Sequence, residues 1–175
     1  MNSSGRFVAR LIAAIVITVM LGLMPALSIA QSSRTAGELP WTWTLGSYRQ
    51  TANVVVGNDE LLVEISDTSE LRERGLSYHA DLRPNTGMLF VYDDIGKRIY
   101  WMKGMNFCLD IVWINDGQIV GAAESVCPEP NRPDADLDRY ASPPEVQYVL
   151  EVPAGWLAAH GYGVGTPVDL SGLDG

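Results

Sequence analysis

Histidine and basic residues are both scarce in this sequence. Only two of its 175 residues are histidine, and His79 and His160 lack the spacing of a zinc-ligand pair, so a zinc site is unsupported. Twelve Lys and Arg residues stand against 21 Asp and Glu residues, which gives a formal net charge of −9. So acidic a surface repels phosphate backbones, and no basic amphipathic stretch is present. We therefore expect neither a nucleic-acid partner nor binding to anionic lipid.

The motifs of common catalytic and cofactor sites are also missing. No G-x-S-x-G surrounds Ser142, so a nucleophilic serine is unsupported. No Gly-rich phosphate loop or dinucleotide fingerprint occurs, and we predict no cofactor. The apolar fraction of 47% against 19% charged residues is nevertheless typical of a packed globule. The length favours one domain over two.

The N-terminus has the pattern of a secretory signal peptide. Arg6 and Arg10 provide a positive region, and an apolar run follows over Leu11–Leu23. Ser28 and Ala30 are small residues at the −3 and −1 positions, which predicts a signal peptide over residues 1–30 with cleavage before Gln31. The alternative is an uncleaved membrane anchor over residues 11–30. Either reading places the rest of this acidic protein outside the cytoplasm, secreted or periplasmic.

Cysteine is limited to Cys108 and Cys127, and neither occupies a lipobox position. An even count in an oxidising compartment favours a disulfide, and two buried reduced cysteines are the alternative. If Asn115 and Gln118 close a two-residue turn, the numbers of facing residues sum to 233, whereas those of the two cysteines sum to 235. A β-bulge or a longer turn would bring the cysteines opposite each other.

The exported part divides into a short lead-in and one globular domain. Residues 31–52 are predicted as a linker, with a possible edge strand at Trp41–Thr44, and residues 53–175 as the domain. Asp67 is predicted to cap a short helix with Glu70 closing a capping box, and Gly75 to end it. A second short helix is expected near 154–159. Strands are expected at 54–56, 61–65, 88–92, 98–102, 109–114, 118–123, 146–152 and 168–170.

These elements predict an α+β fold that is mainly β, a compact single domain of about seven short strands in a barrel-like or folded sheet with two short helices. Seven segments in order resemble the uncharacterised domain of unknown function 192 family over residues 54–170. They are Val63–Thr68, Arg74–Leu76, Gly87–Val91, Trp101–Lys103, Leu109–Ile111, Asp116–Gly117 and Tyr148–Gly155. The resemblance implies a compact, mostly β domain, often exported, and no established activity.

Asp110 is the sharpest candidate site residue. It lies within the apolar run Cys108–Ile114, and a carboxylate there must find donors or have its pKa raised. Lys103 or Arg74 could supply a positive partner and form a binding or acid–base site. The alternative, which we favour, is a structural role in which Asp110 accepts hydrogen bonds from backbone amides at a bulge or pairs with Lys103. The other polar positions of the resemblance that we single out are Tyr140, Ser142 and Glu151.

The leading functional hypothesis is a non-catalytic binding or interaction module for a small polar, sugar-like or peptide ligand, or for a cell-envelope component. The segment Tyr140–Pro144 could form one wall of its cleft. A rival hypothesis is a small hydrolase or transferase, which requires Asp110, Lys103 and Glu151 to converge in one open cleft. A minor alternative is Cu(I) binding by three residues with soft sulfur ligands, Met102, Met105 and Cys108.

Overall fold

The computed structural model describes residues 49–77 and 79–174. The predicted signal peptide, most of the linker and the possible strand at Trp41–Thr44 lie outside the described residues. Within the described ranges, no helix has both the length and the apolar character needed to cross a bilayer. The first strand begins at Thr51, two residues earlier than the predicted domain boundary.

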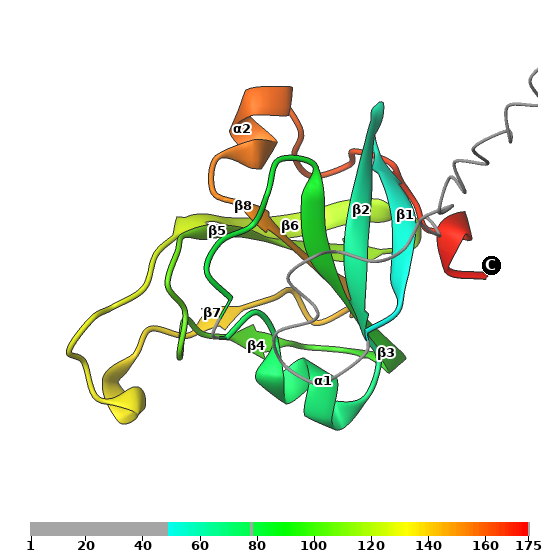
Figure 1. Ribbon diagram of the computed structural model, residues 1–175. Coiled ribbons are helices and arrows are strands. Elements are labelled where there is room, and N and C mark those ends of the chain that lie inside the picture. The colour runs from blue at the N-terminus through cyan, green and yellow to red at the C-terminus, as the bar shows by residue number, and fades with distance from the viewer. Residues whose placement is uncertain (1–48, 78, 175) are drawn as a thin grey trace, which may run out of the picture. The chain divides into compact units, whose positions relative to one another are not determined.

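The domain is mainly β, as predicted, and centres on one curled seven-stranded sheet (Figure 1). Its order is β6-β5-β8-β3-β2-β1-β9, and every neighbouring pair is antiparallel except β2 and β3, which are parallel. The strands are β1 Thr51–Val56, β2 Asp59–Ser66, β3 Thr86–Gly96, β5 Leu109–Asn115, β6 Gln118–Val126, β8 Val146–Pro153 and β9 Val168–Asp169.

A smaller two-stranded sheet and four short helices complete the described fold. Strand β4, Ile99–Tyr100, pairs with β7, Tyr140–Ala141, which the sequence did not predict. Figure 1 shows this pair and α1 below the main sheet, with α2 above it. The helices are α1 Ser69–Arg74, α2 Trp156–His160 and the 3₁₀ turns η2 Asp134–Asp136 and η3 Ser171–Asp174.

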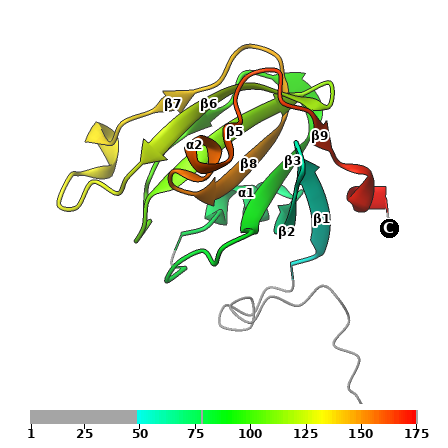
Figure 2. The same ribbon diagram turned by 90° about the horizontal axis from the view of Figure 1, so that it is seen from above.

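The main sheet is covered on both faces, with α2 lying over β5 and β8 (Figure 2), and strand β5, next to the edge strand β6, is buried at every position. Alternate side chains enter two different cores, because successive residues of a strand point to opposite faces. Val112 and Ile114 belong to the core beneath α2, whereas Ile111 and Trp113 belong to the core that contains Leu76 and Tyr100. This explains why Ile111–Ile114 in β5 form an unbroken apolar run rather than an alternating pattern.

Three local predictions need correction. Thr68, not Asp67, is the N-cap of α1, since its hydroxyl oxygen accepts from the Leu71 amide at 3.2 Å. The strand predicted at 98–102 is only β4, whereas the strand predicted at 88–92 is longer than expected, because β3 continues past an irregularity to Gly96. The predicted end of α1 at Gly75 is correct, because this glycine has a φ of 49°.

The β5–β6 hairpin confirms the predicted disulfide and its bulge. Asp116 and Gly117 form the turn with positive φ angles of 47° and 66°. Two irregularities move the pairing from Asn115 opposite Gln118 to Leu109 opposite Val126. The same offset brings Cys108 opposite Cys127, and the structure joins them in a disulfide with a Cα–Cα distance of 4.1 Å.

Candidate functional site

Asp110 has a structural role. Its side chain is fully buried, with Oδ1 accepting from the backbone amides of Ser125 at 2.7 Å and Gly155 at 3.0 Å. Oδ2 accepts from the amide of Leu157 at 3.0 Å. The alternative in which Asp110 accepts hydrogen bonds from backbone amides is therefore correct. Ser125, one of the donors, lies beside the bulge and has a φ of 51°. Asp110 ties the end of β6 to the start of α2.

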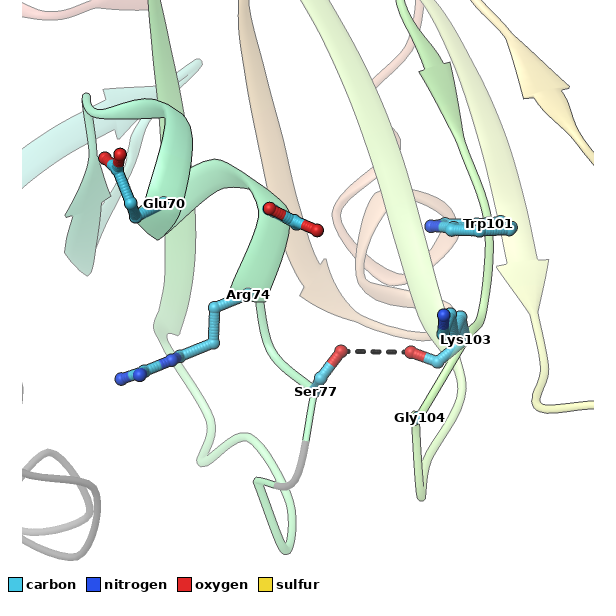
Figure 3. A pocket seen from close by; sticks show the side chains of 7 residues that line it. Glu70, Arg74, Ser77, Trp101, Lys103 and Gly104 are labelled. Atoms are coloured by element: carbon cyan, nitrogen blue, oxygen red, sulfur yellow. Dashed lines mark hydrogen bonds between the residues drawn. The ribbon is translucent and has the colours of Figure 1, made fainter. Parts of the chain in front are cut away.

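The two predicted cationic partners line a surface pocket instead. This cavity of about 380 Å³, which we call the Trp101 pocket, lies between α1 and the segment after β4 (Figure 3). In Figure 3 the Ser77 hydroxyl points across to the Lys103 carbonyl oxygen, to which it donates at 3.0 Å. Its lining consists of Glu70, Glu73, Arg74, Ser77, Trp101, Lys103 and Gly104.

Residues of the β6–β7 loop, 127–139, contact the lining residues Trp101 and Lys103. The Lys103 ammonium lies 2.7 Å from the Asp134 carboxylate. The Arg139 guanidinium carbon lies 3.9 Å from the centre of the Trp101 ring, and the Lys103 ammonium lies 5.2 Å from it. Trp101 keeps 41% of its surface exposed despite these contacts. The pocket therefore combines an aromatic surface with side chains of both charge signs.

The expected cleft wall at Tyr140–Pro144 lies elsewhere. Tyr140 pairs with Tyr100 in the small sheet. Ser142 is buried and fixes the chain next to it, because its hydroxyl accepts from the Arg98 amide at 2.8 Å and donates to the Pro143 carbonyl oxygen at 2.6 Å. The Pro-rich loop does reach the pocket, but through Asp134 and Arg139 rather than through these residues.

A second group of polar side chains lies inside the fold. Glu64 on β2 and Glu151 on β8 are both paired with Met88 on β3, from opposite sides, so their side chains enter the same buried face. Burial raises the pKa of Glu151 to about 8, although Arg49 opposes the shift. Arg49 is itself buried, and its Nε lies 3.6 Å from Glu64. Desolvation lowers the pKa of Arg49, and Glu64 opposes that change.

This group, the Glu64 cluster, comprises Arg49, Glu64, Ser66, His79 and Glu151. His79 Nε2 lies 3.7 Å from Glu64, and neither Glu64 oxygen accepts a hydrogen bond within the described part of the chain. Arg49 donates to Ser66 at 2.5 Å and to the carbonyl oxygens of Leu71 and Gly75 at 3.4 and 3.0 Å. The cluster thereby supports the end of α1, one wall of the Trp101 pocket.

Sequence reasoning missed most of the Glu64 cluster for a physical reason. Glu64 stands between Val63 and Ile65, and this alternation normally indicates a strand with one face in water. Here the second face is covered too, so the glutamate is buried. Arg49 lies in the segment that was predicted to be a linker.

The residues proposed for catalysis or copper do not converge. Asp110 faces the same side of the sheet as its pairing partner Val152, so the neighbouring Glu151 is buried on the opposite side. Lys103 lies at the surface. Cys108 is oxidised in the disulfide, which removes one of the three expected copper ligands, and Met102 is buried in the core. Within residues 49–77 and 79–174, no three His, Cys, Asp or Glu side chains are grouped as a metal site.

Two solved structures share this fold. A candidate transcription regulator from Sinorhizobium meliloti 1021 is 27% identical, with a TM-score of 0.64 over 70% of this chain and 95% of that one. A protein of unknown function from Novosphingobium aromaticivorans DSM 12444 is 23% identical, with a TM-score of 0.64 over 71% of this chain and 89% of that one. No curated protein matches the chain. The family described as "DUF192: Uncharacterized ACR" matches residues 52–170, and the chain belongs to this family.

Proposed function

We propose that this protein is a non-catalytic binding module that works outside the cytoplasm and takes a small polar ligand in the Trp101 pocket. The observation that carries the proposal is the composition of this cavity, which a half-exposed tryptophan lines together with Glu70, Glu73, Arg74 and Lys103. An aromatic surface beside a few converging polar groups is typical of sites for small polar ligands.

The location outside the cytoplasm is supported by two independent features. The first 30 residues have the pattern of a signal peptide. The disulfide between Cys108 and Cys127 is a bond that persists in oxidising compartments. Regulation of transcription, suggested by the name of one structural neighbour, finds no support in a chain with a net charge of −9.

The framework around the pocket suits ligand binding. The pocket walls come from α1 and from the segment after β4, and Ser77 joins the two walls through its hydrogen bond to the Lys103 carbonyl oxygen. Arg49 fixes the C-terminal end of α1 from inside the domain. Such preorganised walls reduce the entropy lost when a ligand binds.

The two lysines of the chain allow a direct test. Lys103 lines the pocket, and Lys97 is an exposed residue outside it. If only the lysine side chains are isotope-labelled, the NMR signal of Lys103 reports on the pocket and the signal of Lys97 is an internal control. The full chain is titrated with trialanine and with a neutral disaccharide. We expect at least one of them to shift the Lys103 signal in a saturable manner while the Lys97 signal stays constant.

A matched pair of variants completes this test. Lys103→Met should weaken binding by about tenfold or more, the effect of losing a hydrogen bond to a charged group, whereas Lys97→Met should leave the affinity unchanged. Binding by the Lys103→Met variant is followed by calorimetry, since the reporter is lost. No saturable response to either compound would overturn the proposed function.

A further inference from the structure

The ammonium of Lys103 in the Trp101 pocket is engaged by the protein's own carboxylate. Asp134 lies 31 positions further along the chain, yet its carboxylate is 2.7 Å from the lysine nitrogen. The two side chains keep 49% and 60% of their surface exposed. An ion pair so accessible to water contributes only about 0.2 to 1 kcal/mol. An anion from solution can therefore compete with Asp134 for Lys103.

The loop that carries Asp134 is held at both ends. It starts at Cys127, in the disulfide with Cys108, and it leads into β7 at Tyr140, which pairs with Tyr100 in the small sheet. Figure 1 shows the part between these ends, in yellow, extending away from the main sheet with η2 at its tip. The ends are thus fixed, whereas η2 at the tip has no buried residue to hold it in the core.

Arg139 links the tip of this loop to the aromatic side of the pocket. Its guanidinium donates to the carbonyl oxygens of Leu137 at 2.7 Å and Asp134 at 3.1 Å. The same guanidinium lies on the Trp101 ring. Asp134 is thereby presented to Lys103 at one end of a cavity whose other wall, on α1, carries Glu70 and Glu73.

From this arrangement we infer that Asp134 occupies the position of the ligand's anionic group, and that the pocket takes a small zwitterion such as a short peptide. The ligand carboxylate replaces Asp134 on Lys103, and the ligand ammonium lies towards Glu70 and Glu73. This inference rests on the proposed function. It adds the ligand class and a role for the 127–139 loop, whose tip is released when the ligand binds.

The competition has a measurable size. While Asp134 pairs with Lys103, only a fraction of the molecules has an accessible ammonium. The apparent association constant for a carboxylate ligand is the intrinsic constant multiplied by this fraction. Removing a competitor worth about 0.2 to 1 kcal/mol should tighten binding by roughly 1.4- to 5-fold. Asp134→Asn removes the competing charge with little change of shape.

The experiment follows the Lys103 side-chain signal in the full chain and in the Asp134→Asn variant. Each is titrated with trialanine, its C-terminal amide and its N-acetyl derivative. We expect trialanine to bind Asp134→Asn 1.4- to 5-fold more tightly than it binds the unchanged protein. Both derivatives should bind more weakly than trialanine, and the amide should no longer distinguish the two proteins. Asp138→Asn is the matched control, because this loop aspartate pairs with Arg132 instead of Lys103.

The outcomes separate the two proposals. Three results would overturn the inference and leave the proposed function standing. Asp134→Asn could bind trialanine no more tightly than the unchanged protein does, or the amide and the free acid could bind equally well. The third result is a response to the neutral disaccharide alone. A gain in affinity shared by Asp138→Asn also overturns it, since the cause would then be the overall charge. An unchanged Lys103 signal with every compound removes the proposed function and the inference together.

Discussion

Glu64 and Glu151 flank Met88 in neighbouring strands and enter one buried face of the sheet, and the Arg49 guanidinium interacts electrostatically with both carboxylates. Two buried carboxylates that share one cation cannot both be charged at low cost, because each charge loses its hydration. Glu151 meets this constraint by holding its proton, and burial raises its pKa from 4.5 to about 8.

This raised pKa predicts how stability depends on pH. Between about pH 4.5 and 8 the folded protein keeps a proton on Glu151 that the unfolded chain releases. The protonated Glu151 therefore makes its full contribution to the free energy of unfolding below pH 4.5. Between pH 4.5 and 8 this contribution decreases by up to about 1.4 kcal/mol for each pH unit, and above pH 8 it is lost. In Glu151→Gln this part of the slope should disappear. Urea unfolding of both proteins at several pH values measures it, and identical slopes would contradict the assignment.

Asp110 should be essential for stability. In Asp110→Ala the amides of Ser125, Gly155 and Leu157 lose their acceptor. The bond from Leu157 is buried and the other two are partly buried, and a buried donor left unpaired costs about 1 to 3 kcal/mol. We expect a loss of about 3 to 5 kcal/mol in the free energy of unfolding, measured by urea denaturation.

The control for this prediction is Asp81→Ala, an exposed aspartate in the loop before β3. It should change stability by less than about 0.5 kcal/mol, as surface substitutions usually do. A comparably small effect of Asp110→Ala would show that water reaches the three amides, and would remove the structural role argued above.

The disulfide should stabilise the β5–β6 hairpin and the start of the 127–139 loop. The two cysteines are 19 positions apart, and closing a loop of this length contributes about 2 to 4 kcal/mol. Replacing both cysteines with serine should lower the free energy of unfolding by this amount. Non-reducing mass spectrometry of the protein should find the Cys108–Cys127 peptide two hydrogens lighter than the reduced pair. Two free thiols would refute the bond.

Sequence reasoning recovered the fold better than the site. The alternation of apolar residues, the Asp116–Gly117 turn and the cysteine spacing depend on contacts close in sequence, and each led to a correct element. The Trp101 pocket joins segments separated along the chain, since Asp134 meets Lys103 only when the β6–β7 loop folds back. The sequence analysis singled out Lys103 as a candidate, but its partner Asp134 followed from the tertiary fold.

Arg49 should be coupled energetically to Glu64. Replacing Arg49 with methionine leaves the buried Glu64 carboxylate with only His79 within salt-bridge distance among the described residues, and breaking a buried pair in this way costs about 3 to 5 kcal/mol. In a Glu64→Gln background the same replacement should cost much less, because no buried charge remains to be compensated. Urea unfolding of the four proteins gives the coupling energy, which we expect to exceed about 1 kcal/mol. Additive effects would show that Arg49 acts mainly through its hydrogen bonds to Leu71 and Gly75, at the end of α1.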